Sequence, residues 1–371
     1  MSLQSVQEDA NKILQTAQAM QGAYTQSIKD VLKDWGHPVW GAQSFFCEYI
    51  SSGKHNHCFK IMHKEERAAP LIMRFPVSAS ELGDVSIVSK SADLAFDETI
   101  YEEQLQLANL GMAPKLYYYC PKKNALIAQF IEGQSLSASD FAQDSLCERV
   151  FDKLGWVHLQ NCKVSHHTRG TWRKSIFLGR ALEYLTDFAA ASKDYSGEIY
   201  SKALYRKYIS VVKHIAVVLK KTDPFLKVPV HNDLIPANIL KTNKGDLHFI
   251  DWDNVKMGDP DEDVANLIWS AELPPEQWSI AIGAYFTSQG GRLCDNTALR
   301  QDRILAYLPL IAFYRAQKYL KHYNNLDALD LQRAFEKMAK SMQDCHQYLA
   351  VKAVQQAVDR LAETSGKGGH A

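Results

Sequence analysis

Short apolar runs separated by polar turns occupy the first third of the chain. The runs CFKIMH (58–63) and PLIMRF (70–75) are joined by the polar turn KEERAA, and KLYYYC (115–120) and NALIAQFI (124–131) flank the turn PKK. Runs of this length, bounded by turn-forming residues, predict strands that pair antiparallel. This part of the chain is therefore expected to form a small sheet.

Helical patterns lie on either side of these strands. Residues 4–35 predict a polar-faced helix that ends before Gly36, and residues 97–110 predict a second helix with an acidic first turn. Beyond Gly133 amphipathic patterns dominate, interrupted by a loop and a hairpin between Val228 and Trp252. The amphipathic segments are residues 140–160, 172–190, 196–221 and about 263–361.

These patterns predict an α+β organisation with a β-rich part followed by a helical part. We expect a helical extension at residues 1–40, a sheet-containing lobe at 41–132, a helical lobe at 133–365 and a disordered tail at 366–371. The Ser-rich stretch at 77–96 has little pattern and is expected to be a loop or lid.

Charge and cysteine content exclude several classes of function. The chain of 371 residues has 42 Lys plus Arg and 42 Asp plus Glu, so no general electrostatic attraction to nucleic acid or to an anionic membrane is expected. Seven cysteines, with no CxxC pair, argue against a disulfide framework and a zinc ribbon. No secretory signal and no apolar run of about 18 residues occurs, so we expect a cytoplasmic protein without membrane insertion.

The most informative chemistry lies in His231–Asn238 and in the sequence FIDWD that follows. Asp233 and Asn238 share one loop, and Asp251 stands at the far end of the following hairpin. Because a hairpin brings its two ends together, Asn238 and Asp251 are expected to face one site, where an amide oxygen and a carboxylate suit Mg²⁺. Asp233 is then placed to accept the proton of a hydroxyl group, as phosphoryl transfer requires.

The sequences HNDLIPANIL and FIDWDNVKMGDPDEDVANL resemble the motifs of the choline kinase and aminoglycoside phosphotransferase superfamily. The resemblance implies a protein-kinase-like fold with a small antiparallel-sheet lobe and a larger, mostly helical lobe. It implies ATP and Mg²⁺ as cofactors and a small-molecule hydroxyl as acceptor. In this resemblance Asp233 is the catalytic base, Asn238 and Asp251 hold the metal, and Asp263 is mainly structural.

The resemblance extends into the β-rich part of the chain. The segment ISSGKHNH, with Gly53 and Asn56, is similar to the family's short phosphate loop, whose backbone N–H groups can cradle phosphate. Arg74 falls where the family places a phosphate-binding cation, and arginine offers a fixed charge and bidentate contact. The helix at 97–110 should supply its glutamate partner. The candidates are Glu98, Glu102 and Glu103, of which Glu102 is preferred.

Two more segments carry the resemblance, which covers about residues 45–325. AQFIEG resembles the hinge between the lobes, where backbone groups of Gln129 and Ile131 would hold adenine. LGWVHL (154–159) resembles the helix that follows the hinge.

The acceptor is predicted from a few positions. Asn232 fits the choline and ethanolamine branch, which traps an ammonium group between aromatic rings and carboxylates. Where that branch typically carries two tryptophans, this chain has Leu310 and Phe313, so Phe313 is the retained aromatic candidate. Other aromatic residues that could compensate are Trp269, Trp278, Tyr307 and Tyr314.

Choline, ethanolamine or a related amino alcohol is the preferred acceptor. A thiamine, sugar-alcohol or aminoglycoside kinase would keep the same catalytic residues. A cationic aminoglycoside would need a pocket of carboxylates, for which Asp259, Asp261, Glu262, Asp263 and Glu272 are candidates. A non-catalytic binding module on the same fold is an alternative of another class. GTP as donor and the oligomeric state stay open.

Overall fold

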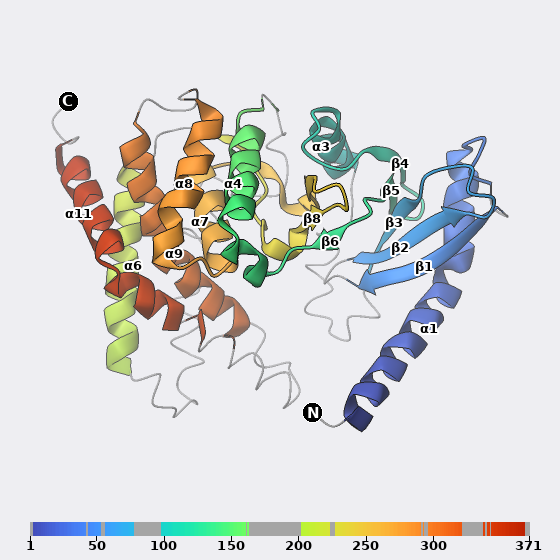
Figure 1. Cartoon of the computed structure of the whole chain (residues 1–371), viewed down its shortest axis with the longest axis horizontal. Coiled ribbons are helices and arrows are strands. Elements are labelled where there is room, and N and C mark those ends of the chain that lie inside the picture. The colour runs from blue at the N-terminus through green and yellow to red at the C-terminus, as the bar shows by residue number, and fades with distance from the viewer. Residues whose placement is uncertain are drawn as a thin grey trace. The chain divides into compact units, whose positions relative to one another are not determined.

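The computed structural model divides the chain into two compact units (Figure 1). Unit 1 contains residues 1–133 and 242–244, and unit 2 contains residues 134–241 and 245–371. The residues that the structure describes are 3–41, 44–52, 56–77, 98–160, 162, 202–222, 227–290, 292, 296–320, 337, 340–341 and 343–367. The segments expected at 77–96 and 172–190 fall almost entirely outside them. No helix within these ranges combines the length and the apolar character that crossing a membrane requires.

Unit 1 is built on a five-stranded antiparallel sheet, and the four apolar runs described above form four of its strands. Its strand order is β1-β2-β3-β5-β4. The strands are β1 (Phe45–Ser52), β2 (Asn56–His63), β3 (Leu71–Pro76), β4 (Leu116–Cys120) and β5 (Ala125–Gln129). Burial alternates along β3, where Leu71, Met73 and Phe75 are covered and the residues between them are partly exposed. The alternation shows that one face of the sheet lies on the core.

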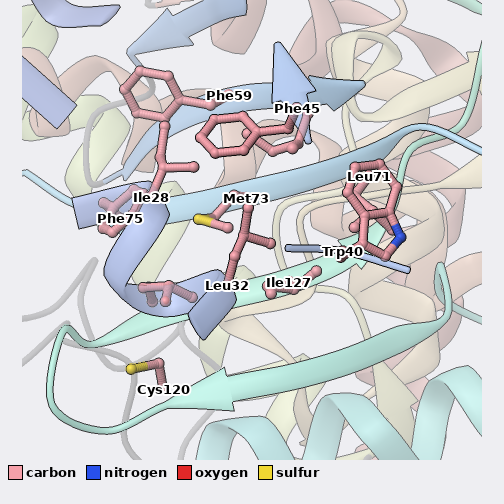
Figure 2. Packing of buried hydrophobic residues seen from close by; sticks show 13 residues of the cluster. Ile28, Leu32, Trp40, Phe45, Phe59, Leu71, Met73, Phe75, Cys120 and Ile127 are labelled. Carbon is pink, nitrogen blue, oxygen red and sulfur yellow. The ribbon is translucent and has the colours of Figure 1, made fainter. Parts of the chain in front are cut away.

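The long first helix, α1 (Leu3–Trp35), contributes to this core. Ile28 and Leu32 are fully buried against sheet residues that include Phe59 and Met73 (Figure 2). Residues 1–40 were expected to be an extension, but the last three turns of α1 supply apolar side chains that cover one face of the sheet. At their end, Asp34 accepts hydrogen bonds from the Tyr118 hydroxyl at 2.7 Å and from Lys122 at 2.9 Å.

Unit 2 is mainly helical and also contains two small sheets. Its helices are α4 (Asp144–His158), α6 (Lys202–Lys221), α7 (Pro260–Ser270), α8 (Pro275–Gln289), α9 (Thr297–Leu320) and α11 (Lys352–Lys367), with 3-10 turns at Ala138–Ala142, Pro236–Asn238 and Trp252–Asn254. Its strands are β6 (Gln134–Ser135), β7 (Val228–Val230), β8 (Ile239–Lys241), β9 (Leu247–Phe249) and β10 (Lys256–Gly258). The tail was expected from residue 366, but α11 runs to Lys367, and residues 368–371 lie outside the described residues.

The two small sheets contain the hairpin predicted between Val228 and Trp252 and the two strands that flank it. Strands β8 and β9 pair antiparallel and form that hairpin, with β6 alongside β8. Strands β7 and β10 pair antiparallel on either side of it. Gly258 in β10 lies so close to β7 that a Cβ there would be 2.4 Å from Val230 Cγ2. The chain thus enters the hairpin through β7 and leaves it through β10, and the close approach of these two strands requires glycine at position 258.

Candidate active site

The loop between β7 and β8 carries the residues predicted to be catalytic, and its backbone brings them together. Asn238 donates from Nδ2 to the backbone oxygen of Asp233 at 2.8 Å. The backbone oxygen of Asn238 accepts from the N–H of Ile250 at 2.9 Å, which places Asp251 next to it. One asparagine therefore joins the Asp233 turn to the Asp251 end of the hairpin.

Two residues of this site have a left-handed backbone. Asn232 has a φ of 64° and Asp251 has a φ of 65° with a ψ of 55°. Residues other than glycine avoid this region, although asparagine and aspartate tolerate it better than most because their short side chains bond locally. The Asn232 side chain makes a tertiary contact, in which its Nδ2 donates to the backbone oxygen of Asn254 at 2.6 Å. Non-glycine residues in this region concentrate at functional sites.

Asp263, on α7, holds the start of the loop. Its carboxylate is 2% exposed and accepts hydrogen bonds from the backbone N–H groups of His231 at 2.7 Å and Asn232 at 2.9 Å. His158 Nε2 of α4 lies 3.4 Å from the same carboxylate. Burial alone would raise the pKa of Asp263, but these hydrogen bonds and the nearby imidazoles lower it. Asp263 is therefore an ionised anchor of the fold, as the resemblance implies.

The imidazole of His231 fixes the other side of the loop. Its Nε2 lies 2.8 Å from the backbone oxygen of Ile250, and its ring packs 4.5 Å from the Trp252 ring, centre to centre. The residue is completely buried. These contacts connect the loop to the end of the hairpin and leave Asp233 as the partly exposed acid, with 34% of its side chain accessible.

An arginine that sequence reasoning did not identify lies beside Asp233. Arg315 Nη2, from α9, is 3.4 Å from Asp233 Oδ1 and 3.1 Å from the Oδ1 of Asn266. Asn266 in turn donates to the backbone oxygen of Leu234 at 3.0 Å. The sequence showed Arg315 only as a lone charged residue in the apolar run LIAFYRA. Its pairing with Asp233 depends on how α9 packs, which the sequence pattern does not give.

The donor set at the end of the hairpin fits a hard divalent cation. Asn238 uses its amide nitrogen for the loop bond, so its Oδ1 is the atom left to ligate, and Asp251 is an exposed carboxylate. Amide and carboxylate oxygens are ligands that Mg²⁺ accepts, together with water and phosphate oxygens. The assignment of these two residues as metal ligands remains a prediction.

The aromatic residues considered for the acceptor lie mostly in the core. Phe313 is fully buried in unit 2, and its contact with the acceptor stays a prediction. Tyr307 is 2% exposed and donates to Asp259 Oδ2 at 2.8 Å, and Trp278 donates to the backbone oxygen of Leu273 at 2.9 Å. Trp269 lies under Arg315, whose guanidinium carbon is 5.5 Å from its ring centre.

Most of the carboxylates considered for a cationic pocket are also engaged. Asp261 is fully buried and accepts from Arg300 Nε at 2.8 Å and from Arg303 Nε at 2.9 Å. Asp259 is buried, pairs with Arg303, and caps α7 by accepting from the N–H of Asp261 at 3.0 Å. Glu272 is exposed but pairs with Lys340. Because Asp259 and Asp261 are neutralised by buried arginines, these two carboxylates are not available to line a pocket for an aminoglycoside.

In unit 1 the structure separates the glutamates of α3 (Glu98–Asn109). Glu102 is exposed, whereas Glu103 is 3% exposed. A buried carboxylate needs a cation or several donors, and an exposed one does not. We therefore replace Glu102 by Glu103 as the proposed partner of Arg74. Arg74 lies on β3, opposite Cys58 of β2 and Leu126 of β5.

Two of the remaining residues predicted to hold nucleotide, Asn56 and Gln129, lie at the ends of strands. Gly53 is outside the described residues, and Asn56 begins β2 and is 7% exposed. Gln129 ends β5, and its backbone N–H donates to the backbone oxygen of Lys115 at 2.8 Å. Ile131 follows and is 9% exposed. Their roles in adenine and phosphate binding stay predictions.

The sheet unit, the helical unit and the loop–hairpin site together define a kinase-like fold. The chain belongs to the phosphotransferase enzyme family, whose model matches residues 98–301. The "Protein LicA homolog" of Metamycoplasma hominis is 36% identical over 188 residues, which is 48% of this chain and 63% of that protein. The chain thus spans less than two thirds of the length of this curated relative.

Solved structures support the fold. A choline/ethanolamine kinase family protein from Mesorhizobium loti matches with a TM-score of 0.66 and 15% identity, over 91% of this chain and 98% of that one. Aminoglycoside 2'-phosphotransferase-IIIa in complex with GDP matches with a TM-score of 0.58 and 14% identity, over 87% of this chain and 99% of that one. Both acceptor classes share the fold, so the fold does not select between them.

Proposed function

We propose that this protein is a kinase that transfers phosphate from ATP to the hydroxyl group of a small molecule. The arrangement of Asp233, Asn238 and Asp251 carries the proposal. Asp233 has a partly exposed carboxylate, and the hydrogen bonds of Asn238 join the Asp233 turn to the segment that carries Asp251. An acid, an amide oxygen and a second carboxylate are the set that phosphoryl transfer uses. Family membership supports the reaction class.

In this mechanism Asp233 orients the acceptor hydroxyl and takes its proton. The hydroxyl oxygen bonds to the γ-phosphorus of ATP, and the bond from that phosphorus to the oxygen bridging to the β-phosphate breaks, so that ADP leaves. Asn238 and Asp251 would hold Mg²⁺, which neutralises phosphate charge when bound. Arg74 would contribute a fixed positive charge to the phosphates. His231 and Asp263 keep the loop in place and exchange no proton.

An amino alcohol such as choline or ethanolamine is the proposed acceptor. The support is the partial match to the LicA homolog and the fold of the choline/ethanolamine kinase family protein. The internally paired Asp259 and Asp261 disfavour an aminoglycoside. Since Leu310 stands at one of the branch's two aromatic positions and Phe313 is fully buried at the other, an ammonium group would need contacts from further residues.

The test is nucleotide consumption by purified protein with Mg²⁺ and ATP or GTP. The acceptor panel contains choline, ethanolamine, thiamine, a kanamycin-type aminoglycoside and simple sugars. Turnover that depends on an amino alcohol supports the proposal, and turnover with another member of the panel keeps the mechanism and changes the acceptor. Nucleotide binding without turnover on any acceptor would favour a non-catalytic binding module.

Two variants test the assignment of the base. Asp233→Ala should abolish turnover and leave nucleotide affinity close to wild type, because Asp233 acts on the acceptor. Asp302→Ala is the matched control, since it removes a carboxylate of α9 that pairs with Arg360 at 2.5 Å. It should leave turnover unchanged. Near-normal turnover by Asp233→Ala would refute the mechanism.

A further inference from the structure

Arg315 is nearly covered, and its guanidinium ends beside the proposed catalytic carboxylate. The arginine side chain is 12% exposed and the Asp233 side chain 34%, with 3.4 Å between Nη2 and Oδ1. The flat guanidinium also lies on the ring of Trp269. An arginine in this setting has one orientation available to it and can impose that orientation on the more accessible acid.

A second contact carries the effect of Arg315 into the main chain of the loop. Asn266 is 1% exposed and accepts from Arg315 Nη2 while donating to the backbone oxygen of Leu234. Leu234 directly follows Asp233 in the loop. One guanidinium therefore touches the carboxylate of the base and, through Asn266, the peptide group next to it.

We propose that Arg315 is a positioning residue for phosphoryl transfer, which fixes the rotamer of Asp233 so that its carboxylate faces the acceptor hydroxyl. The inference rests on the proposed function. A lysine could approach Asp233 as a point charge, but it could not also stack flat on Trp269 and present a planar set of donors to Asn266. Orientation matters because a misplacement of about 1 Å in a catalytic group can cost on the order of 100-fold in rate.

Arginines that only stabilise α9 have different surroundings. Arg303 is 1% exposed and contacts two carboxylates, the Leu219 backbone oxygen at 2.7 Å and the Thr222 hydroxyl at 3.2 Å. Arg315, in contrast, has a buried Nε–H without a hydrogen-bond partner among the residues that the structure describes. Leaving a buried donor unpaired costs stability, and such groups are expected where function sets the geometry. The contacts of Arg315 therefore favour a role at the site over a role in stability alone.

The experiment compares three variants of the full-length protein. Arg315→Met keeps the length and apolar character of the stem and removes the charge, whereas Arg315→Lys keeps the charge and removes the planar group. Arg360→Met is the matched control, because Arg360 also pairs with a carboxylate, that of Asp302, but is far more exposed than Arg315. The measurements are kcat and KM with Mg²⁺, ATP and choline or ethanolamine, nucleotide affinity, and melting temperature.

We expect Arg315→Met to lower kcat by about 10–100-fold with nucleotide affinity within about twofold of wild type. Arg315→Lys should recover part of the loss, and Arg360→Met should leave kcat unchanged. Wild-type kcat in Arg315→Met would overturn the proposal, as would losses of nucleotide affinity and melting temperature that parallel the loss of kcat. If Arg315→Met does not fold, Arg315→Lys decides, because a selective fall in kcat supports positioning and an unchanged kcat contradicts it.

Failure of the proposed function would be recognised separately. In that case the wild-type protein itself would turn over neither acceptor. The coupling between Arg315 and Asp233 can then be tested by melting temperature alone. Arg315→Met should lower it less in an Asp233→Ala background than in the wild-type background, because the partner carboxylate is already gone. Equal decreases in the two backgrounds would overturn the inferred coupling.

Discussion

Replacing Asp263 with alanine should destabilise the loop that carries Asp233. The two oxygens of Asp263 accept from the backbone N–H groups of His231 and Asn232, and the carboxylate also faces His158. Alanine leaves both backbone donors without their partner in a place that water reaches poorly. The same change removes the connection between α7 and the start of the loop.

The magnitude follows from the two lost acceptors. A buried donor left without a partner costs about 1–3 kcal/mol, so the two together should lower the free energy of unfolding by about 2–6 kcal/mol. The effect should depend on pH, because the folded pKa of Asp263 is lowered. The stabilisation by the carboxylate is complete above its unfolded pKa of about 3.9 and is lost as the pH falls through the lower folded pKa.

Urea unfolding followed by circular dichroism measures this difference, near neutral pH and in steps into the acid range. Glu65→Ala is the control, since Glu65 and its partner Arg67 are 61% and 70% exposed and an exposed ion pair contributes about 0–1 kcal/mol. The reasoning is refuted if Asp263→Ala costs no more than this control, or if the difference from wild type persists undiminished well below the unfolded pKa.

Three further outcomes are expected. Leu32→Ala should lower the free energy of unfolding by about 2–5 kcal/mol in urea, because the side chain is fully buried; a loss below about 1 kcal/mol would contradict its place in the core. Glu103→Gln should lower kcat/KM for ATP by about tenfold, and Glu102→Gln should leave it unchanged, in the same steady-state assay. The hydrogen bond from Tyr118 and, after it, that from Lys122 lower the pKa of Asp34 to about 2. The stability that the ionised Asp34 contributes is therefore present above about pH 3.9 and is lost as the pH falls toward 2. In Tyr118→Phe the melting temperature should therefore begin to fall at a higher pH than in wild type when the solution is acidified. An unchanged dependence of the melting temperature on acid pH would exclude this hydrogen bond as the cause.

The pattern of apolar and polar residues predicted the helices and strands that are long enough to show a repeat. Strands β2, β3, β4 and β5, helix α3 and the hairpin of β8 and β9 lie within a few residues of their expected positions. β7 and β10 were not predicted, because a strand of three residues has no period and its partner lies about 28 residues away. The contribution of α1 to the core was also missed, since the pattern of a helix reveals an apolar face and not what covers it.

At the site, the spacing of residues along the chain predicted which residues lie in one loop, but the sequence did not predict which side of a helix is buried. The spacing from Asp233 to Asn238 survives folding because both belong to one loop. Glu102 and Glu103 differ by one residue, which is a rotation of about 100° on a helix and decides which is buried. Arg315 belongs to the site only because α9 packs beside α7, a contact that no local pattern encodes.

The composition of the core of unit 1 has a consequence for synthesis on the ribosome. Ile28 of α1 and Ile127 of β5 belong to the same cluster, although about 100 residues separate them. At translation rates of roughly 5–20 residues per second, the apolar side of α1 waits for about 5–20 s before the last strand that it covers has been made. During this interval the first helix must remain solvated or be shielded by other factors, so the polar residues of α1 serve the nascent chain as well as the finished protein.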